Sequence, residues 1–136
     1  VGISGLIIPA LPFEENCSLA KKCAKLGIAL VPLISVTTGH RAKKILKHAS
    51  GFVYMIASLG VTGSKQSPED RLKELAKNIK KISSLPVAVG FGVRSNEDVK
   101  RLRSFCDGVI MGTVLVEASK NKSVSELNAL ISELFA

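Results

Sequence analysis

Five short apolar runs, separated by stretches with helical spacing, constrain the fold of this chain more than any other feature. The runs occupy residues 5–9, 28–34, 52–57, 86–89 and 108–111. Because each run is apolar at consecutive positions, both faces of the corresponding strand are expected to be buried. Strands of this kind that alternate with helices form a parallel sheet covered by helices.

Helices are expected at residues 14–26, 38–49, 68–82, 95–104, 114–119 and from Ser123 or Ser125 to about 134. Ser67 precedes Pro68 and two acidic residues, which is a strong helix start. Ser95, with Asp98 three residues later, resembles a capping box. Thr38 is expected to cap the second helix. The whole chain, residues 1–136, is interpreted as a single domain.

The composition argues against several functional classes. No apolar run approaches the roughly 18 residues of a membrane-spanning helix, so no membrane association is expected. The net charge of +8 could indicate nucleic-acid binding. However, acidic residues stand at expected helix starts and basic residues later in the same helices, as the helix dipole favours. Only five Phe and one Tyr could stack on bases. We therefore expect solvated helix faces and no nucleic acid.

Three cysteines and two histidines are the candidates for metal or redox chemistry. An odd cysteine count without metal-ligand spacing argues against disulfides and zinc, so Cys17, Cys23 and Cys106 are interpreted as reduced hydrophobic residues of a cytoplasmic protein. His40 and His48 stand at a helix start and near a helix end, and are expected at the surface. We expect no metal and no catalytic histidine.

Glycines cluster after the last three apolar runs, and they help to choose between an open doubly wound sheet and a (βα)8 barrel. They are Gly60, Gly63, Gly90, Gly92 and Gly112. No G-x-G-x-x-G follows the first run, whereas barrels commonly bind phosphate with the loops after their last two strands and a short extra helix. Glycines let backbone N–H groups approach an anion, and the hydroxyl of Thr113 adds a donor. The sequence predicts a phosphate site between Gly63, Gly92 and the Gly112–Thr113 turn.

A full barrel needs about 200 residues or more, so five strands are expected to be the C-terminal part of one. The start of the chain lacks an initiator Met and the features of a signal peptide, so we expect a chain cut at an internal point. Five strands would leave two sheet edges and an apolar inner face open, so self-association is expected. The inward candidates are Ile7, Val31, Val53, Val87 and Ile110. A well-behaved monomer would instead favour an open-sheet α/β fold.

Six segments of the chain carry a family resemblance: residues 5–9 (GLIIP), 11–15 (LPFEE), 50–54 (SGFVY), 60–63 (GVTG), 85–92 (LPVAVGFG) and 107–112 (DGVIMG). In order and approximate spacing they resemble the alpha subunit of tryptophan synthase. The resemblance covers essentially the whole chain, from that family's fourth strand onward. It implies a barrel that cleaves indole-3-glycerol phosphate to indole and glyceraldehyde 3-phosphate, without a cofactor. It also implies a beta subunit as partner, in a heterotetramer.

The resemblance assigns roles to individual residues. Gly63, Gly92, Gly112 and Thr113 would hold the substrate phosphate, where the family more often has Ser at the position of Thr113. Tyr54, Phe91 and Ile110 would line the indole pocket. Thr62 would orient a catalytic Asp that comes from an earlier strand.

Departures from the family leave alternatives open. The family's catalytic Glu and Asp come from its second strand and the loop after it, and this chain contains neither. It therefore carries no catalytic residue of its own and is expected to be inactive alone. Ala10 replaces the Asp usual at its position, and Ser58 stands where some members have a basic residue. The alternatives are a non-catalytic regulatory partner of a beta subunit, or a fragment of another phosphate-binding barrel enzyme.

Overall fold

The computed structural model describes residues 2–9, 13–57, 67–90 and 92–136. Its strands are β1 (Gly5–Ile7), β2 (Ala29–Val31), β3 (Leu33–Ser35), β4 (Val53–Ile56), β5 (Val87–Gly90) and β6 (Gly108–Ile110). All paired strands are parallel, in the orders β1-β2 and β3-β4-β5-β6. Each of the five apolar runs therefore enters a parallel sheet, as the sequence predicted.

The second run forms two strands rather than one, because Pro32 interrupts it. Proline has no N–H to donate to a neighbouring strand. Its carbonyl oxygen still accepts a hydrogen bond from the Tyr54 N–H at 2.9 Å. The chain passes from β2, which pairs with β1, directly into β3, which pairs with β4. The segment thus joins the two ladders at Pro32.

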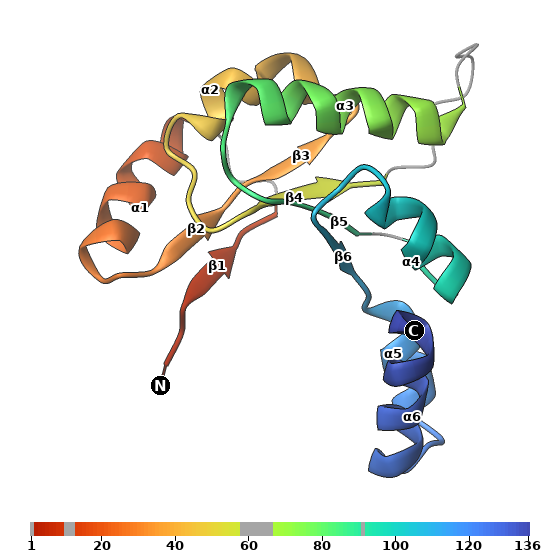
Figure 1. Ribbon diagram of the computed structural model, residues 1–136. Helices are drawn as coiled ribbons and strands as arrows, with labels where there is room; N and C mark the ends of the chain where they lie inside the picture. The colour runs from red at the N-terminus through yellow and green to blue at the C-terminus, as the bar shows by residue number, and fades with distance from the viewer. Residues whose placement is uncertain (1, 10–12, 58–66, 91) are drawn as a thin grey trace.

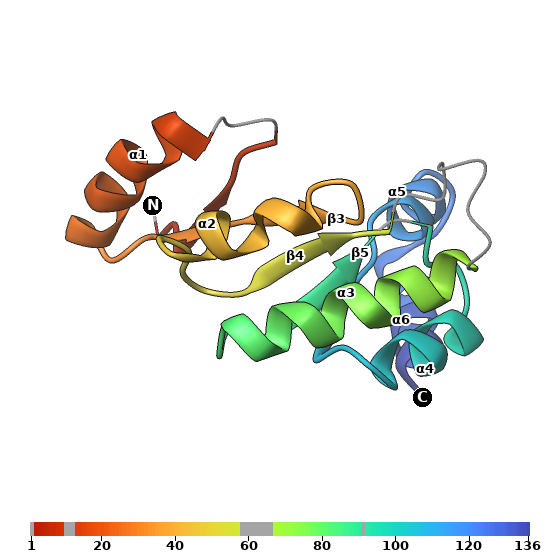
Figure 2. The same ribbon diagram turned by 90° about the horizontal axis from the view of Figure 1, so that it is seen from above.

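The helices are α1 (Phe13–Lys25), the 3-10 helix η1 (Gly39–Arg41), α2 (Ala42–Leu46), α3 (Pro68–Ile82), α4 (Asn96–Arg103), α5 (Thr113–Ser119) and α6 (Val124–Phe135). Helices α1 to α4 lie on one side of the sheet (Figure 1). Seen from above, these four helices follow one another across it (Figure 2). A doubly wound sheet would carry helices on both faces. Helices on one face only are the arrangement of a barrel wall.

Helix capping follows the sequence at three of the four predicted starts. Ser67 accepts a hydrogen bond from the Asp70 N–H, and Ser95 forms a capping box with Asp98. Ser123, rather than Ser125, caps α6 through a second capping box with Glu126. The prediction for Thr38 is wrong, because its hydroxyl accepts from the Ser35 N–H at 2.9 Å instead of capping η1.

The core lies between the sheet and α2, α3 and α4. Its fully buried members are Ile34, Val53, Met55, Ile79, Val87, Val89 and Val99. Two of the inward candidates, Val53 and Val87, are thus wrong, since both pack under the helices. An entirely apolar strand gives no sign of which alternate set of side chains faces which side. The opposite face carries Tyr54, Ala88 and Ile110, all partly exposed, while Ile7 on β1 is 45% exposed.

The far end of the chain is tied to α4 by a side-chain amide. Asn96 Nδ2 donates to the carbonyl oxygens of Glu133 and Leu134, at 3.1 and 3.2 Å. Leu134 is buried, whereas Val116 and Val124 are 61% and 75% exposed. Helices α5 and α6 project beyond β6 (Figure 1). Within the described ranges, no helix has both the length and the apolarity to cross a bilayer.

Asp107 joins α3 to β5, and its removal should destabilise the fold. Its carboxylate accepts from Lys80 Nζ and from the Val87 N–H, both at 2.8 Å. We expect Asp107→Ala to lower the free energy of unfolding by about 1 kcal/mol, because charge-assisted bonds at an exposed site are screened by water. Chemical denaturation measures this. Glu117→Ala, at an exposed acid of α5, should change stability little; an equal loss in both variants would contradict the prediction.

The same carboxylate should make stability depend on pH. The bond from Lys80, and then the bond from the Val87 N–H, lower the pKa of Asp107 below 3.8. Its contribution is therefore present above that value and is lost as the pH falls through the lower pKa of the folded state. The stability difference between wild type and Asp107→Ala should shrink over that acidic range.

Candidate functional site

The candidate site lies where β4, β5 and β6 end. Because these strands are parallel, their carboxyl ends meet at one edge of the sheet, where barrels carry their active sites. The turn after β5 contains Gly92, and the turn after β6 contains Gly112 and leads into Thr113, the first residue of α5. Thr62, Gly63 and Phe91 lie outside the described residues. The predicted site is thus described in part.

Gly92 has a backbone conformation that favours glycine. Its φ is +79°, in the left-handed region where a Cβ would be strained. Gly92 is exposed, so the turn leaves its backbone open to solvent. Val93, the next residue, is only 5% exposed and belongs to the core. One side of the turn is therefore anchored while the glycine faces outward.

The Gly112–Thr113 turn presents the start of α5. Gly112 occupies the N-cap position and no side chain caps the helix there. Its carbonyl oxygen accepts from the N–H groups of Leu115 and Val116, at 3.1 and 2.9 Å. Gly112 and Thr113 are exposed, and a Cβ on Gly112 would meet nothing within 4 Å. The first amides of α5 and the Thr113 hydroxyl are thus accessible to a ligand.

Tyr54 and Ile110 come together over Gly90 on the face opposite the helices. The register pairs Ile56 with Gly90 and Gly90 with Ile110. A Cβ on Gly90 would lie 2.5 Å from the Tyr54 hydroxyl and 3.1 Å from the Ile110 Cβ. Gly90 therefore leaves the space that the tyrosine ring occupies. This role of Gly90 is not among the sequence-based predictions, although a glycine ending an apolar strand is a signal of close approach.

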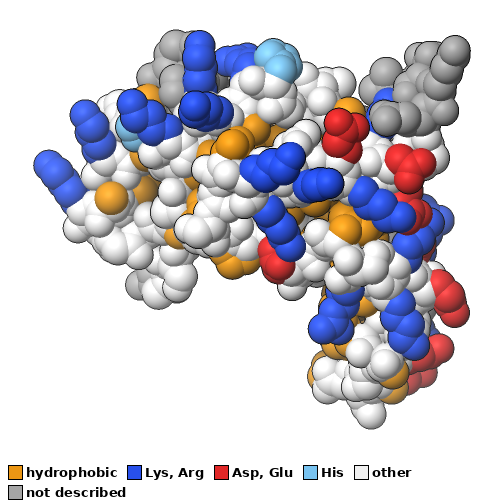
Figure 3. Space-filling model, turned by 45° about the horizontal axis from the view of Figure 1, so that its top comes forward, with side chains coloured by type: hydrophobic (Ala, Val, Ile, Leu, Met, Phe, Trp, Pro, Cys, Tyr) orange, Lys and Arg blue, Asp and Glu red, His pale blue; other side chains and the backbone are white. Residues whose placement is uncertain are grey.

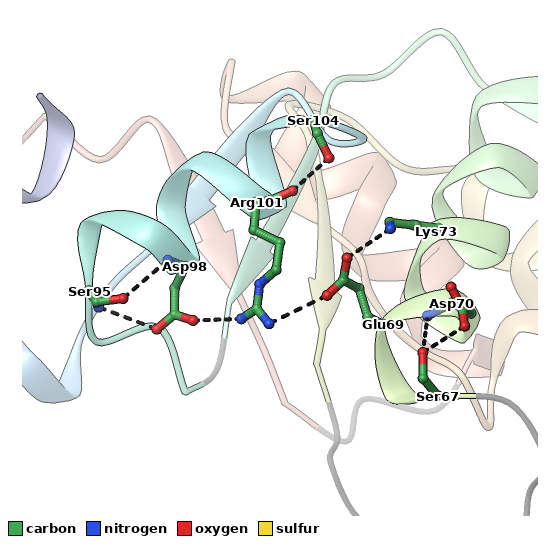
Figure 4. Close-up of polar contacts among 8 residues, drawn as sticks. All are labelled: Ser67, Glu69, Asp70, Lys73, Ser95, Asp98, Arg101 and Ser104. Atoms are coloured by element: carbon green, nitrogen blue, oxygen red, sulfur yellow. Dashed lines mark hydrogen bonds and ion pairs between the residues drawn. The ribbon is translucent and has the colours of Figure 1, made fainter.

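Several acidic side chains of the described residues form ion pairs or hydrogen bonds at helix starts. Glu69 pairs with Lys73 at 2.8 Å and with Arg101 at 3.4 Å, and Asp70 accepts from Ser67 (Figure 4). The Arg94 N–H is the main cause that lowers the pKa of Asp98. These carboxylates lie on the helix side of the sheet, where they contact cations, a hydroxyl or backbone N–H groups. They do not replace the acid/base pair that the resemblance implies.

Charge is distributed unevenly over the surface. The sequence contains no Asp or Glu between Glu15 and Glu69, yet it contains lysines in the second half of α1 and in α2, and Arg41 in η1. Among the described side chains, Figure 3 shows Lys and Arg in blue, and no Asp or Glu in red, over this part of the surface. His40 is exposed and His48 is half-buried in the same region. No group of three metal-ligating side chains occurs in the described ranges.

Among the described residues, two grooves lie on the helix side of the sheet. One of about 280 Å³ is lined by residues of η1 and α3, including Arg71 and Leu75. The other, of about 310 Å³, lies between α4 and the end of α6. Neither contains a residue of the predicted site.

The cysteines Cys23 and Cys106 are buried, and burial is the main cause that raises the pKa of the Cys106 thiol.

Comparisons with known proteins agree on one family. The family model "Tryptophan synthase alpha chain" matches residues 1–134. A tryptophan synthase alpha chain of Campylobacter jejuni subsp. doylei is 46% identical over 136 residues, covering 99% of this chain and 55% of that protein. One from Thermoanaerobacter sp. is 38% identical, covering 98% of this chain and 53% of that protein. The chain thus spans about half the length of these relatives.

Solved structures show the same partial overlap. The tryptophan synthase subunit alpha from Campylobacter jejuni superposes with a TM-score of 0.89 at 46% identity, covering 98% of this chain and 54% of the other. The tryptophan synthase complex from Pyrococcus furiosus matches with a TM-score of 0.76 at 29% identity, covering 98% and 53%. These neighbours are (βα)8 barrels, so the expected fold, part of such a barrel, is confirmed.

Filling the space at Gly90 should displace Tyr54. We expect Gly90→Ala to change the fluorescence of Tyr54, because its Cβ would meet the phenol at 2.5–2.9 Å. Tyr54 is the only tyrosine and the chain has no tryptophan, so the emission reports this ring. Overpacking of this kind costs roughly 1–3 kcal/mol of stability. In the control Gly108→Ala, the Cβ meets Ala88 at an ordinary 3.4 Å. An unchanged spectrum in Gly90→Ala would contradict the assigned contact.

Proposed function

Because the chain belongs to the tryptophan synthase alpha chain family, we propose that it forms part of a lyase that cleaves indole-3-glycerol phosphate to indole and glyceraldehyde 3-phosphate. The observation that carries the proposal is the family match over residues 1–134. The arrangement at the strand ends supports it. An aromatic and an aliphatic side chain, Tyr54 and Ile110, lie together on the bare face, which is the sheet face opposite the helices, beside two glycine turns.

The chain's own residues would bind and orient the substrate. The first amides of α5, the Thr113 hydroxyl and the Gly92 turn would hold the phosphate, since helix starts and glycine turns present N–H donors to anions. By family resemblance, Gly63 would add a donor from the preceding turn. Tyr54, Phe91 and Ile110 would hold the indole ring. Binding of the phosphate and of the indole ring at the same time would hold the carbon–carbon bond between them in position for cleavage.

The 136 residues alone would not perform the chemistry. Cleavage requires one carboxylate to move a proton at the indole ring and another to help break the carbon–carbon bond. Glu69 of α3 and Asp98 of α4 are held in ion pairs, and Asp98 also forms a capping box. Thr62 would orient an Asp that this sequence does not contain. We therefore propose a binding contribution from this segment, without catalysis in isolation.

A tryptophan synthase beta subunit is the proposed protein partner. The solved relative from Pyrococcus furiosus is described as a tryptophan synthase complex. By family resemblance, the contacts would involve residues 11–16 and 58–67. The departure at Ala10 falls outside the described residues.

Calorimetric titration tests the phosphate subsite. We expect wild type to bind inorganic phosphate and Thr113→Val to bind about tenfold more weakly, because one hydrogen bond to a charged group is lost. Thr113→Ser keeps the hydroxyl and should bind as wild type does. Indole release from indole-3-glycerol phosphate should be undetectable in the same preparations. Equal affinities in Thr113→Val and wild type would exclude the assigned hydroxyl, and indole release would exclude inactivity in isolation.

We also propose that the 136-residue chain self-associates. Among the described strands, β1 and β6 are the edges, and parallel edges expose unpaired N–H and C=O groups. Tyr54, Ile56 and Ile110 lie only partly buried on the bare face, and Ile7 is 45% exposed on β1. A second copy could cover this apolar surface.

Sedimentation analysis measures the association. Wild type should sediment as a dimer or larger species, and Ile7→Lys should shift it toward monomer, because a charge on the edge strand opposes burial. Leu26→Lys is the matched control, since Leu26 is 74% exposed directly after α1 and lies on no strand. A wild-type monomer would contradict self-association. An equal shift in both variants would contradict the β1 edge as the contact.

A further inference from the structure

We infer that Arg101 is a positioning residue for the Gly92 turn, acting through Asp98 and Glu69. Its guanidinium contacts two carboxylates with different nitrogens. Nη2 lies 2.5 Å from Asp98 Oδ1, and Nη1 lies 3.4 Å from Glu69 Oε2 (Figure 4). Arg101 therefore joins the first turn of α3 to the first turn of α4. These helices follow β4 and β5, whose carboxyl ends carry the candidate site.

The contact continues from Asp98 into the backbone of the turn. Asp98 Oδ2 accepts from the N–H groups of Arg94 and Ser95, at 3.1 and 3.3 Å. Arg94 is two residues beyond Gly92, whose φ is +79°. Arg101 thus contacts one carboxylate oxygen of Asp98. The other oxygen accepts hydrogen bonds from the backbone that follows Gly92. A single side chain connects the α3 start to the geometry of this turn.

Glu69 also has a second partner. Its Oε1 accepts from Lys73 Nζ at 2.8 Å, one helical turn along α3. Glu69 and Asp98 are each held at both oxygens, so their positions are defined from two sides. The planar guanidinium can contact two carboxylates at once, which a lysine ammonium reproduces only in part. Loss of Arg101 would leave the two carboxylates with no cation between them.

The exposure of these ion pairs indicates that they position the Gly92 turn rather than raise the global stability of the fold. The side chains of Arg101, Glu69 and Asp98 are 53%, 29% and 26% exposed. Ion pairs at that exposure contribute little to global stability. Their effect should therefore fall on the local turn, where the backbone hydrogen bonds to Asp98 are formed. The consequence for phosphate binding rests on the proposed function, because Gly92 belongs to the proposed phosphate subsite.

Hydrogen exchange of the turn tests the inference without any ligand. Exchange in a peptide covering residues 92–98 is measured by mass spectrometry for wild type, Arg101→Met, Arg101→Lys and Arg103→Met. Arg103 is an exposed arginine of the same helix and takes part in no ion pair of the described residues. We expect Arg101→Met to raise the exchange rate roughly two- to fivefold, the range for exposed ion pairs. Arg101→Lys should restore part of the protection, and Arg103→Met should match wild type.

Phosphate affinity supplies the second readout. The calorimetric Kd for inorganic phosphate should rise roughly two- to fivefold in Arg101→Met, with the melting temperature little changed. Unchanged exchange in Arg101→Met would overturn the inference. Raised exchange with an unchanged Kd would overturn its role in binding. If wild type binds no phosphate while Arg101→Met still raises exchange, the proposed phosphate subsite fails and the hold of Arg101 on the turn stands.

Discussion

The alternation of side chains along β4 and β5 is the constraint on which the rest of this structure depends. Successive residues of a strand point to opposite faces. Val53, Met55, Val87 and Val89 consequently fill the helix-covered core, where each is fully buried. Tyr54, Ala88 and Gly90 are left for the other face. The same few residues therefore bind the helices to the sheet and shape the candidate site, so a shift of one position would exchange the two sets.

Local sequence signals predicted most of the architecture. Ser67 and Ser95 cap the predicted helices because capping depends on a few neighbouring residues. The glycines after β5 and β6 likewise marked the turns. The faces of the strands could not be predicted, because runs such as residues 52–57 are apolar at nearly every position. The failure at Thr38 has a similar cause: its hydroxyl had a competing local partner in Ser35.

Some features of the candidate site depend on local sequence, and others depend on contacts between residues far apart in the chain. Family resemblance identified Tyr54 and Ile110, and the structure places them together over Gly90. The role of Gly90 depends on a contact between neighbouring strands, so the glycine at the strand end signals a close approach without showing which side chain makes it. The bridge from Glu69 to Arg101 depends likewise on the packing of α3 beside α4. Side chains that join separate elements are therefore the part of the site that sequence reasoning alone misses.

Pro32 divides the molecule into two units of unequal size. The β1-β2 ladder and α1 pack with each other, and their buried residues Cys23, Leu30 and Val31 stand apart from the main hydrophobic cluster. The main cluster extends from Ile34 to Cys106. A unit with few contacts to its neighbour opens at lower free energy than the whole. Strand β1, α1 and β2 would thus open before the main cluster does, with Pro32 and the hydrogen bonds between Leu30 and Ser50 at the boundary.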